Sequence, residues 1–457
     1  MVFTLMPIIF LIGIILVALE DVIKINKTAI VLAMSIILWG LFLLDADAIL
    51  AHNTALSLFS EELPHFSNLT LHERITEFME TSLIHALGDV SSTLFFIMGS
   101  MALIEMIDVH GAFSMISHWI RIENKRLLLW IISGLTFLFS AIIGNLATVI
   151  VMITVVSKIL KKRPDRLLFA CMIIVASNAG GSWSPIGDVT TLMLWTGGNL
   201  SMSQQASHVI IPALCMLIIP LIATTFMLEN GPIRNADPEE DTNRLGEHIS
   251  NRFKTTLLVI TLLSFISVPI LQTWIDLPPF MGIFLGLVAI WIITDRRYGA
   301  KKSDLFQRLR MGHAFTRIDI STVLYFLGVL LSVDALKTAG QLDLLAHTFE
   351  KLFPAPESIA LMLGVCSSFL DNVALVAAAI GMYPIQVAGP FMADGIFWTF
   401  LAYCGVTGGS LLIIGSASGI TAMGLEKIPF SYYLKKFTPW VTIAYFVGAG
   451  VFLLLYA

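Results

Sequence analysis

The stretch Ser177-Asn178-Ala179-Gly180-Gly181-Ser182-Trp183-Ser184-Pro185-Ile186-Gly187-Asp188-Val189-Thr190-Thr191 lies inside an otherwise apolar segment, residues 167–196. Glycine and proline interrupt helices. The stretch therefore predicts two half-helices joined by a polar break. The ends of these half-helices expose backbone amides and carbonyls to whatever lies between them.

A matching pattern occurs about 228 residues later, in the apolar segment 391–423. In a membrane protein, duplicated breaks in apolar segments are the best sequence indication of a transporter's binding site. Within the two broken segments, Gly180-Gly181-Ser182 corresponds to Gly408-Gly409-Ser410, and Ile186-Gly187-Asp188 corresponds to Ile414-Gly415-Ser416. Earlier in each copy, Gly144-Asn145-Leu146-Ala147 corresponds to Asp371-Asn372-Val373-Ala374. At the start of each copy, Asp89-Val90-Ser91-Ser92 corresponds to Asp319-Ile320-Ser321-Thr322.

The composition is that of an integral membrane protein. Apolar residues make up 57% of the 457 residues and charged residues only 13%, and the mean hydropathy is +0.86. A soluble protein carries about 25% charged residues. The net charge of -5, with no long basic stripe, gives no indication of a nucleic-acid partner.

Many apolar segments approach the roughly 20 residues that cross the hydrocarbon core. Two of them, 127–157 and 357–382, carry a polar pair near the middle and are predicted to be hairpins that enter and leave by the same face. The other predicted spans are 4–19, 28–44, 88–107, 167–196, 208–228, 255–272, 279–294, 319–336, 391–423 and 437–456.

Loop charges predict the orientation, because short cytoplasmic loops concentrate Lys and Arg. Basic residues flank both ends of 127–157, whereas the loops 197–207 and 383–390 are uncharged and the segment 45–87 is acidic. The first hairpin is therefore predicted to open to the cytoplasm and the second to the outside. Charge alone does not distinguish a shallow hairpin from two short spans, but the polar tips favour the re-entrant form.

The predicted fold is an all-α polytopic membrane protein with two inverted-topology repeats, two re-entrant helical hairpins and two broken transmembrane helices. Both chain ends are predicted to lie outside. The predicted regions are the N-terminal helices with an external acidic segment (1–88), the first repeat (89–228), a cytoplasmic loop with linking helices (229–318), and the second repeat with the C-terminal helix (319–457).

Asp188 and Asp371 are the strongest candidate functional residues. An ionised carboxylate at the centre of a bilayer costs about 3 kcal/mol, and the cores of these segments contain no Lys or Arg. A bound cation or proton is thus favoured over an internal salt bridge. The oxygen-rich surroundings suit Na⁺, and no His or Cys cluster indicates a transition metal. The predicted ligands beside the two acids are Ser140, Asn145, Thr148, Asn178, Ser182, Thr190, Thr191, Ser367, Asn372, Thr407, Ser410, Ser416 and Ser418.

Four other acids lie at the ends of apolar segments. Glu105 and Asp334 correspond between the repeats; they are either solvated helix ends or accessory acids on an ion path. Asp89 and Asp319 precede serines and are predicted to cap helix starts. Residues 70–86, upstream of Asp89, have an apolar side that is typical of an interfacial helix.

At these residues the chain resembles the NhaD-type sodium/proton antiporters of the ion-transporter superfamily, above all at Ser177–Trp195 and Ser367–Ala374. The resemblance covers nearly the whole chain. It implies exchange of cytoplasmic Na⁺ or Li⁺ for external H⁺, a homodimer, no cofactor, and the inner membrane of a bacterium. It also implies roles in pH homeostasis and salt tolerance. The family's polar residues fall on Ser140, Asn145, Asn178, Asp188, Thr190, Thr191, Ser367, Asp371, Asn372, Ser416 and Ser418.

The chain departs from this family at Gly144, where the family's first hairpin usually has an Asp before the Asn. A rival from the same superfamily is sodium-coupled uptake of a dicarboxylate or another anion. Those carriers typically place Ser-Asn-Thr at both hairpin tips, and Asp371 would repel an anion. An intramembrane enzyme is disfavoured because no HExxH motif or plausible nucleophile elbow occurs. A passive channel is disfavoured because paired repeats suit alternating access.

Overall fold

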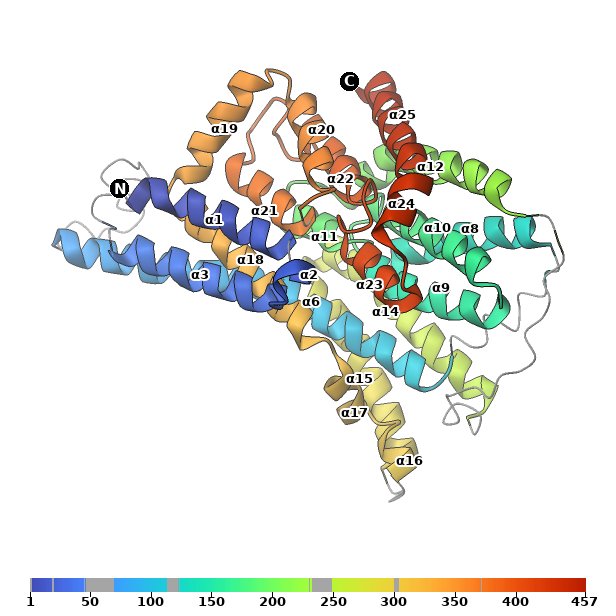
Figure 1. Ribbon diagram of the computed structural model, residues 1–457. Coiled ribbons are helices and arrows are strands. Elements are labelled where there is room, and N and C mark those ends of the chain that lie inside the picture. Colours follow the sequence, from blue (N-terminus) through green and yellow to red (C-terminus); the bar gives the residue numbers. More distant parts are fainter. Residues whose placement is uncertain are drawn as a thin grey trace.

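The computed structural model describes residues 2–18, 20–44, 46, 70–112, 122, 124–229, 231, 249–299, 304–370 and 372–457. Within these ranges the regular structure is helical and includes no strand (Figure 1). Eight of the described helices are long and apolar enough to cross a membrane. The prediction of an all-α polytopic membrane protein is therefore confirmed.

The N-terminal helices pack against a helix that lies about 290 residues later in the chain. Helices α1 (Val2–Ala18) and α3 (Lys27–Leu44), joined by the short α2 (Glu20–Ile23), pack with α18 (Ile320–Thr338) at the left of Figure 1. Thr28 Oγ1 donates a hydrogen bond to Ser321 O at 2.8 Å, and Trp39 Nε1 donates one to Leu331 O at 2.9 Å. These bonds fix the register between α3 and α18.

Helix α6 runs unbroken from Leu71 to Val109. Residues 71–86 are helical as the first part of α6, but the prediction that Asp89 caps a new helix is wrong, because residue 89 lies inside α6. The helix instead begins at a capping box, in which the Thr70 side chain accepts from Glu73 N and the Glu73 carboxylate accepts from Thr70 N at 2.8 Å. No proline follows to stop the helix before Val109. The predicted cap at Asp319 is confirmed, since its carboxylate accepts from Thr322 N at 3.2 Å.

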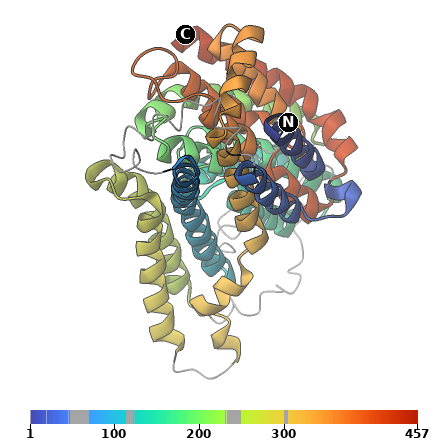
Figure 2. The ribbon, with the colours of Figure 1, turned by 90° about the vertical axis from the view of Figure 1, so that its left-hand side faces the viewer.

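Helices α14 (Asn251–Ile275) and α15 (Pro279–Tyr298) form a closely packed pair beside α6 (Figure 2). A Cβ added at Gly286 would lie 1.6 Å from Ser264 Oγ. Small residues let helix backbones approach closely in membranes. Gly286 therefore lets α15 pack closely on α14 of the same chain.

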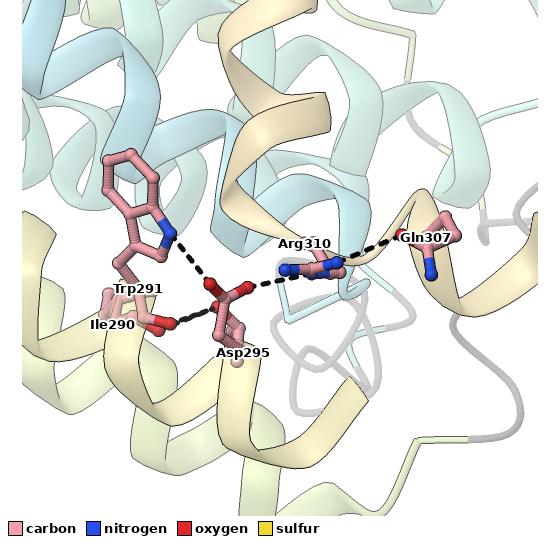
Figure 3. Close-up of polar contacts among 6 residues, drawn as sticks. Ile290, Trp291, Asp295, Gln307 and Arg310 are labelled. Carbon is pink, nitrogen blue, oxygen red and sulfur yellow. Dashed lines mark hydrogen bonds and ion pairs between the residues drawn. The ribbon is translucent and has the colours of Figure 1, made fainter. Parts of the chain in front are cut away.

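Two short helices, α16 (Asp304–Gln307) and α17 (Met311–Arg317), connect α15 to α18. Arg310 holds this connection against α15: its Nε donates to Asp295 Oδ1 at 2.9 Å and its guanidinium also donates to Gln307 Oε1 (Figure 3). Trp291 Nε1 donates to the other Asp295 oxygen at 3.0 Å. The connection is thereby held beside α15, and α17 packs on α6.

The remaining helices occur in two comparable series. The first series is α8 (Lys125–Ile143), α9 (Asn145–Ile159), α10 (Arg163–Ser182), α11 (Val189–Thr196) and α12 (Met202–Met227). The second is α20 (Pro356–Cys366), α21 (Asn372–Met382), α22 (Ile396–Gly408), α23 (Ala417–Glu426) and α25 (Thr438–Tyr456). Helix α19 (Gln341–Leu352) precedes the second series, and α24 (Phe430–Lys436) lies within it; neither was predicted from the sequence.

The predicted helix breaks are present in both series. Segments 127–157 and 357–382 break between α8 and α9 and between α20 and α21; segments 167–196 and 391–423 break between α10 and α11 and between α22 and α23. Corresponding glycines bring these elements together. A Cβ at Gly180 would lie 2.2 Å from Phe137 O, and one at Gly408 would lie 1.9 Å from Gly364 O. Helices α8 and α20 thus pack directly on the backbones of α10 and α22.

The two series interlock at their breaks. Helix α23 packs against α9 and α10 of the first series, and α11 packs against α21 and α22 of the second. These helices lie at the centre of the view in Figure 1. As a result, all four breaks meet in the interior.

Candidate functional site

Four helices begin at one central cavity of about 620 Å³. The first residues of α9, α11, α21 and α23 all line it, namely Asn145, Val189, Asn372 and Ala417. The first amides of a helix have no partner within that helix and give its start a partial positive charge. The part of the cavity beside these four helix starts, here called its floor, is therefore suited to negative charge.

The Asp188 carboxylate occupies this floor. Asp188 is the N-cap of α11; its side chain is 6% exposed and lines the cavity. Its Oδ1 accepts from Thr190 N at 2.8 Å and from Thr190 Oγ1 at 2.7 Å, and its Oδ2 accepts from Asn145 Nδ2. The Thr191 hydroxyl completes the cap by accepting from Asp188 N at 3.2 Å. The break thus fixes a carboxylate next to open space.

Asn178 connects this carboxylate to the second series. Its Oδ1 accepts from Asn145 Nδ2 at 3.2 Å and from Ser418 Oγ at 2.6 Å. Its Nδ2 donates to Ser410 Oγ at 2.8 Å and to Ser416 Oγ at 3.0 Å. The polar residues of both breaks therefore form one hydrogen-bonded cluster.

Other predicted ligands donate their hydroxyl groups to the backbone. Ser140 Oγ donates to Ser177 O at 2.5 Å, and its counterpart Ser367 Oγ donates to Gly405 O at 2.8 Å. Ser182 and Thr407 donate to carbonyls of their own helices. The bond from Ser140 joins α8 to α10, and the bond from Ser367 joins the end of α20 to α22.

Three further predicted site residues are Thr148, Asn372 and Asp371. The buried Thr148 hydroxyl finds no hydrogen-bond partner within the described part of the chain. Asn372, at the start of α21, lines the same cavity as Asp188. Asp371 lies outside the described residues, directly before the start of α21.

Charged side chains line one part of the cavity, here called the charged mouth: Glu105, Asp108, Lys158, Arg317 and Asp319. Glu105 on α6 forms an ion pair with Arg317 at the end of α17, with Oε1 and a guanidinium nitrogen 2.7 Å apart. Asp108, Lys158 and Asp319 line the same region. Asp334, the counterpart of Glu105, is not among the residues that line this cavity. Arg317 and Asp108 were not predicted as site residues, although Glu105 and Asp108 share a helix face because they are three positions apart.

Gly144 lies at the break between α8 and α9, where the sequence of the second series has Asp371. Its φ is 88°, a left-handed value that favours glycine. Its amide donates to Ser140 O at 3.1 Å, and the next amide, Asn145 N, donates to Gly187 O at 2.9 Å. The α8–α9 turn is thereby fixed to the α10–α11 break. An aspartate at this position would strain the turn.

Comparison with known proteins identifies the family. The citrate transporter family model matches residues 4–400, so the chain belongs to that family. The chain is 32% identical to sodium/proton antiporter 2 of Arabidopsis thaliana over 98% of both chains. It is 37% identical to sodium/proton antiporter 1 of the same plant over 83% of this chain, but the match covers only 64% of that relative. The Na⁺/H⁺ antiporter NhaD of Vibrio cholerae is 28% identical over 83% of this chain and 81% of its own length.

These relatives confirm the similarity to NhaD-type antiporters that the sequence indicates. The family and its relatives are transporters, which agrees with the prediction that the chain is not an enzyme. Plant proteins are among the relatives, so the family extends beyond bacteria.

Proposed function

We propose that this chain is a secondary transporter that exchanges cytoplasmic Na⁺ or Li⁺ for external H⁺. The observation that carries the proposal is the Asp188 carboxylate at the floor of the cavity, where four helices begin. The names of the relatives, which are sodium/proton antiporters, support the same reaction.

Cation and proton compete for the same carboxylates in this proposal. Asp188 and Asp371 bind a largely dehydrated Na⁺, and neighbouring hydroxyl, amide and backbone oxygens complete its shell. Burial favours the protonated form of a carboxyl group, whereas an adjacent Na⁺ favours the ionised form. Each ligand therefore expels the other. No separate cofactor takes part.

Alternating access follows from the membrane topology that we propose. Helices α8–α9 and α20–α21 act as re-entrant hairpins in two repeats of opposite orientation, at about 89–196 and 319–423. Lys158 and Arg317 line the cavity mouth, and basic residues concentrate on the cytoplasmic side. The described conformation is therefore open to the cytoplasm. Movement of the paired hairpins and broken helices against the other helices exposes the site to the outside.

We also propose that the chain works as a homodimer in the inner membrane of a bacterium. There it contributes to pH homeostasis and salt tolerance. These proposals rest on the resemblance to NhaD-type antiporters.

Sodium-coupled uptake of an anion is the second candidate. The name of the family and the convergence of four helix N-termini both favour a negatively charged substrate. However, the carboxylate of Asp188 already occupies this position and accepts hydrogen bonds from Thr190 and Asn145. A substrate carboxylate would be repelled at the same place, so we favour cation exchange.

Inverted membrane vesicles that contain the protein distinguish the two candidates. A fluorescent probe reports the pH gradient while Na⁺, Li⁺, K⁺, succinate and citrate are added in turn, the acids as salts of an untransported cation. We expect Na⁺ or Li⁺ to collapse the gradient and the organic acids to leave it unchanged. A response to succinate or citrate without one to alkali cations would contradict cation exchange.

The charged mouth provides a test of how cations enter. Replacing Arg317 with Gln removes a positive charge beside Glu105 and Asp108. We expect the apparent KM for cytoplasmic Na⁺ to fall by about two- to five-fold at low ionic strength, because a more negative mouth concentrates cations. In about 0.5 M choline chloride the difference should disappear, because salt screens exposed charges.

Arg310→Gln is the matched control. Arg310 pairs with Asp295 on the outer side of the same connection, and neither residue lines the cavity. The control should keep the wild-type KM. Equal changes in both variants would show that loosening of α17, rather than charge at the mouth, causes the effect.

A further inference from the structure

Asn178 is placed asymmetrically between the two breaks. It lies on α10 and is completely buried, yet three of its partners, Ser410, Ser416 and Ser418, belong to the second series. These serines stand 228 positions after Ser182, Asp188 and Thr190. The amide of Asn178 therefore occupies the second-series equivalent of the position around Asp188.

The second series has no residue equivalent to Asn178 that could contact the first break in the same way. The residue 228 positions after Asn178 is Val406, which has no polar group to offer the first break. The two breaks thus differ in what fills them. The first break carries a carboxylate that faces the cavity, and the second carries a neutral amide from the other series.

The hydrogen bonds fix the direction of this amide. The Asp188 carboxylate accepts from Asn145 Nδ2, so Asn145 presents its amino group and requires an acceptor on Asn178. That acceptor is Oδ1 of Asn178. The amino group of Asn178 consequently points at Ser410 and Ser416.

The Ser416 oxygen then has no capacity left for a cation. A hydroxyl oxygen accepts at most two hydrogen bonds. Ser416 Oγ accepts from Asn178 Nδ2 at 3.0 Å and from Gly419 N at 3.2 Å. Because the Ser418 hydroxyl donates to Asn178 Oδ1, the contact of 2.9 Å between the two serines has Ser416 as its donor. Both lone pairs and the proton of Ser416 are in use.

We propose that the amide of Asn178 takes the place of a second cation, so that the chain binds one alkali cation, at Asp188, rather than one at each break. This inference rests on the proposed function and specifies its site. The serines of the second break, predicted as ligands, act instead as partners of Asn178. Asn178 is a positioning residue that sets the number of ions carried.

The test is the number of Na⁺ ions bound per purified chain at about pH 9, where exchange with protons is least competitive. Equilibrium dialysis with radioactive Na⁺ should give one ion for the wild type. Asn178→Asp puts a carboxylate beside Ser410 and Ser416 and should raise the number toward two. Asn251→Asp adds the same charge at the exposed start of α14 and should leave it at one.

Each outcome decides a different point. Two ions bound to the wild type would overturn the inference and leave cation exchange intact, whether or not Asn178→Asp folds. No bound ion would overturn the proposed function itself. A folded Asn178→Asp variant that still binds one ion would also overturn the inference, because an open second position should accept the cation.

Discussion

Asp188→Asn should reduce Na⁺-dependent proton movement in vesicles to the background level. The substitution keeps the shape of the side chain and removes the charge that faces the cavity. Loss of an ionised ligand that is worth about 3 kcal/mol lowers cation affinity roughly 100-fold. The amide group also does not titrate, so it can neither bind nor release a proton during transport. Transport should therefore fail at every Na⁺ concentration.

The fold should survive this substitution. Asn caps helices about as well as Asp, and the Asn oxygen can still accept from Thr190 N, as Asp188 does at 2.8 Å. The midpoint of thermal unfolding in detergent should therefore stay close to that of the wild type. Asp343→Asn removes an exposed carboxylate on α19 and should transport normally. Activity of Asp188→Asn near the wild-type level would remove Asp188 from the mechanism.

Asp371→Asn should abolish Na⁺-dependent proton movement as well. In the sequence, Asp371 stands directly before Asn372, which begins α21 and lines the cavity. In the first series the corresponding position is Gly144, so Asp371 is the second acid that the paired breaks offer. Without it, one carrier of the proton or cation is lost.

Asp371→Glu provides the matched comparison. It retains a titratable carboxyl group one methylene further from the backbone and should restore part of the exchange at a higher KM for Na⁺. The same vesicle assay measures both variants, and the amount of protein in the membrane is compared by immunoblot. Exchange by Asp371→Asn equal to that of the wild type would contradict the assignment of this residue.

The sequence predicts the helical architecture well because the membrane imposes it. Lipid offers no hydrogen bonds, so apolar segments must be helical, and polar breaks within them must face protein or a water-filled cavity. The breaks around Gly144, Gly187 and Gly415 accordingly lie where the polar residues predict them. The hydrogen bond from Asn145 to Asp188 joins two of these breaks, and both residues were predicted as parts of one site.

Contacts between distant segments could not be predicted in this way. Helix α6 already begins at its cap Thr70, so Asp89 lies inside a helix that started upstream. An acid followed by serines can therefore lie within a helix and need not mark a new helix start. The role of Asn178 depends on which hydroxyls face it across the two series, which are more than 220 residues apart. Arg317 falls within the predicted cytoplasmic region 229–318, and its pairing with Glu105 could not be predicted because it depends on how α17 packs on α6.

Competition between Na⁺ and H⁺ is the central claim, and calorimetric titration of the purified protein with Na⁺ tests it most directly. Between about pH 9 and about pH 6 the account predicts that the apparent Kd rises, by up to about tenfold per pH unit for each proton displaced. Titrations in buffers with different ionisation enthalpies should show protons released as Na⁺ binds. A Kd that does not change with pH, with no proton release, would contradict the account.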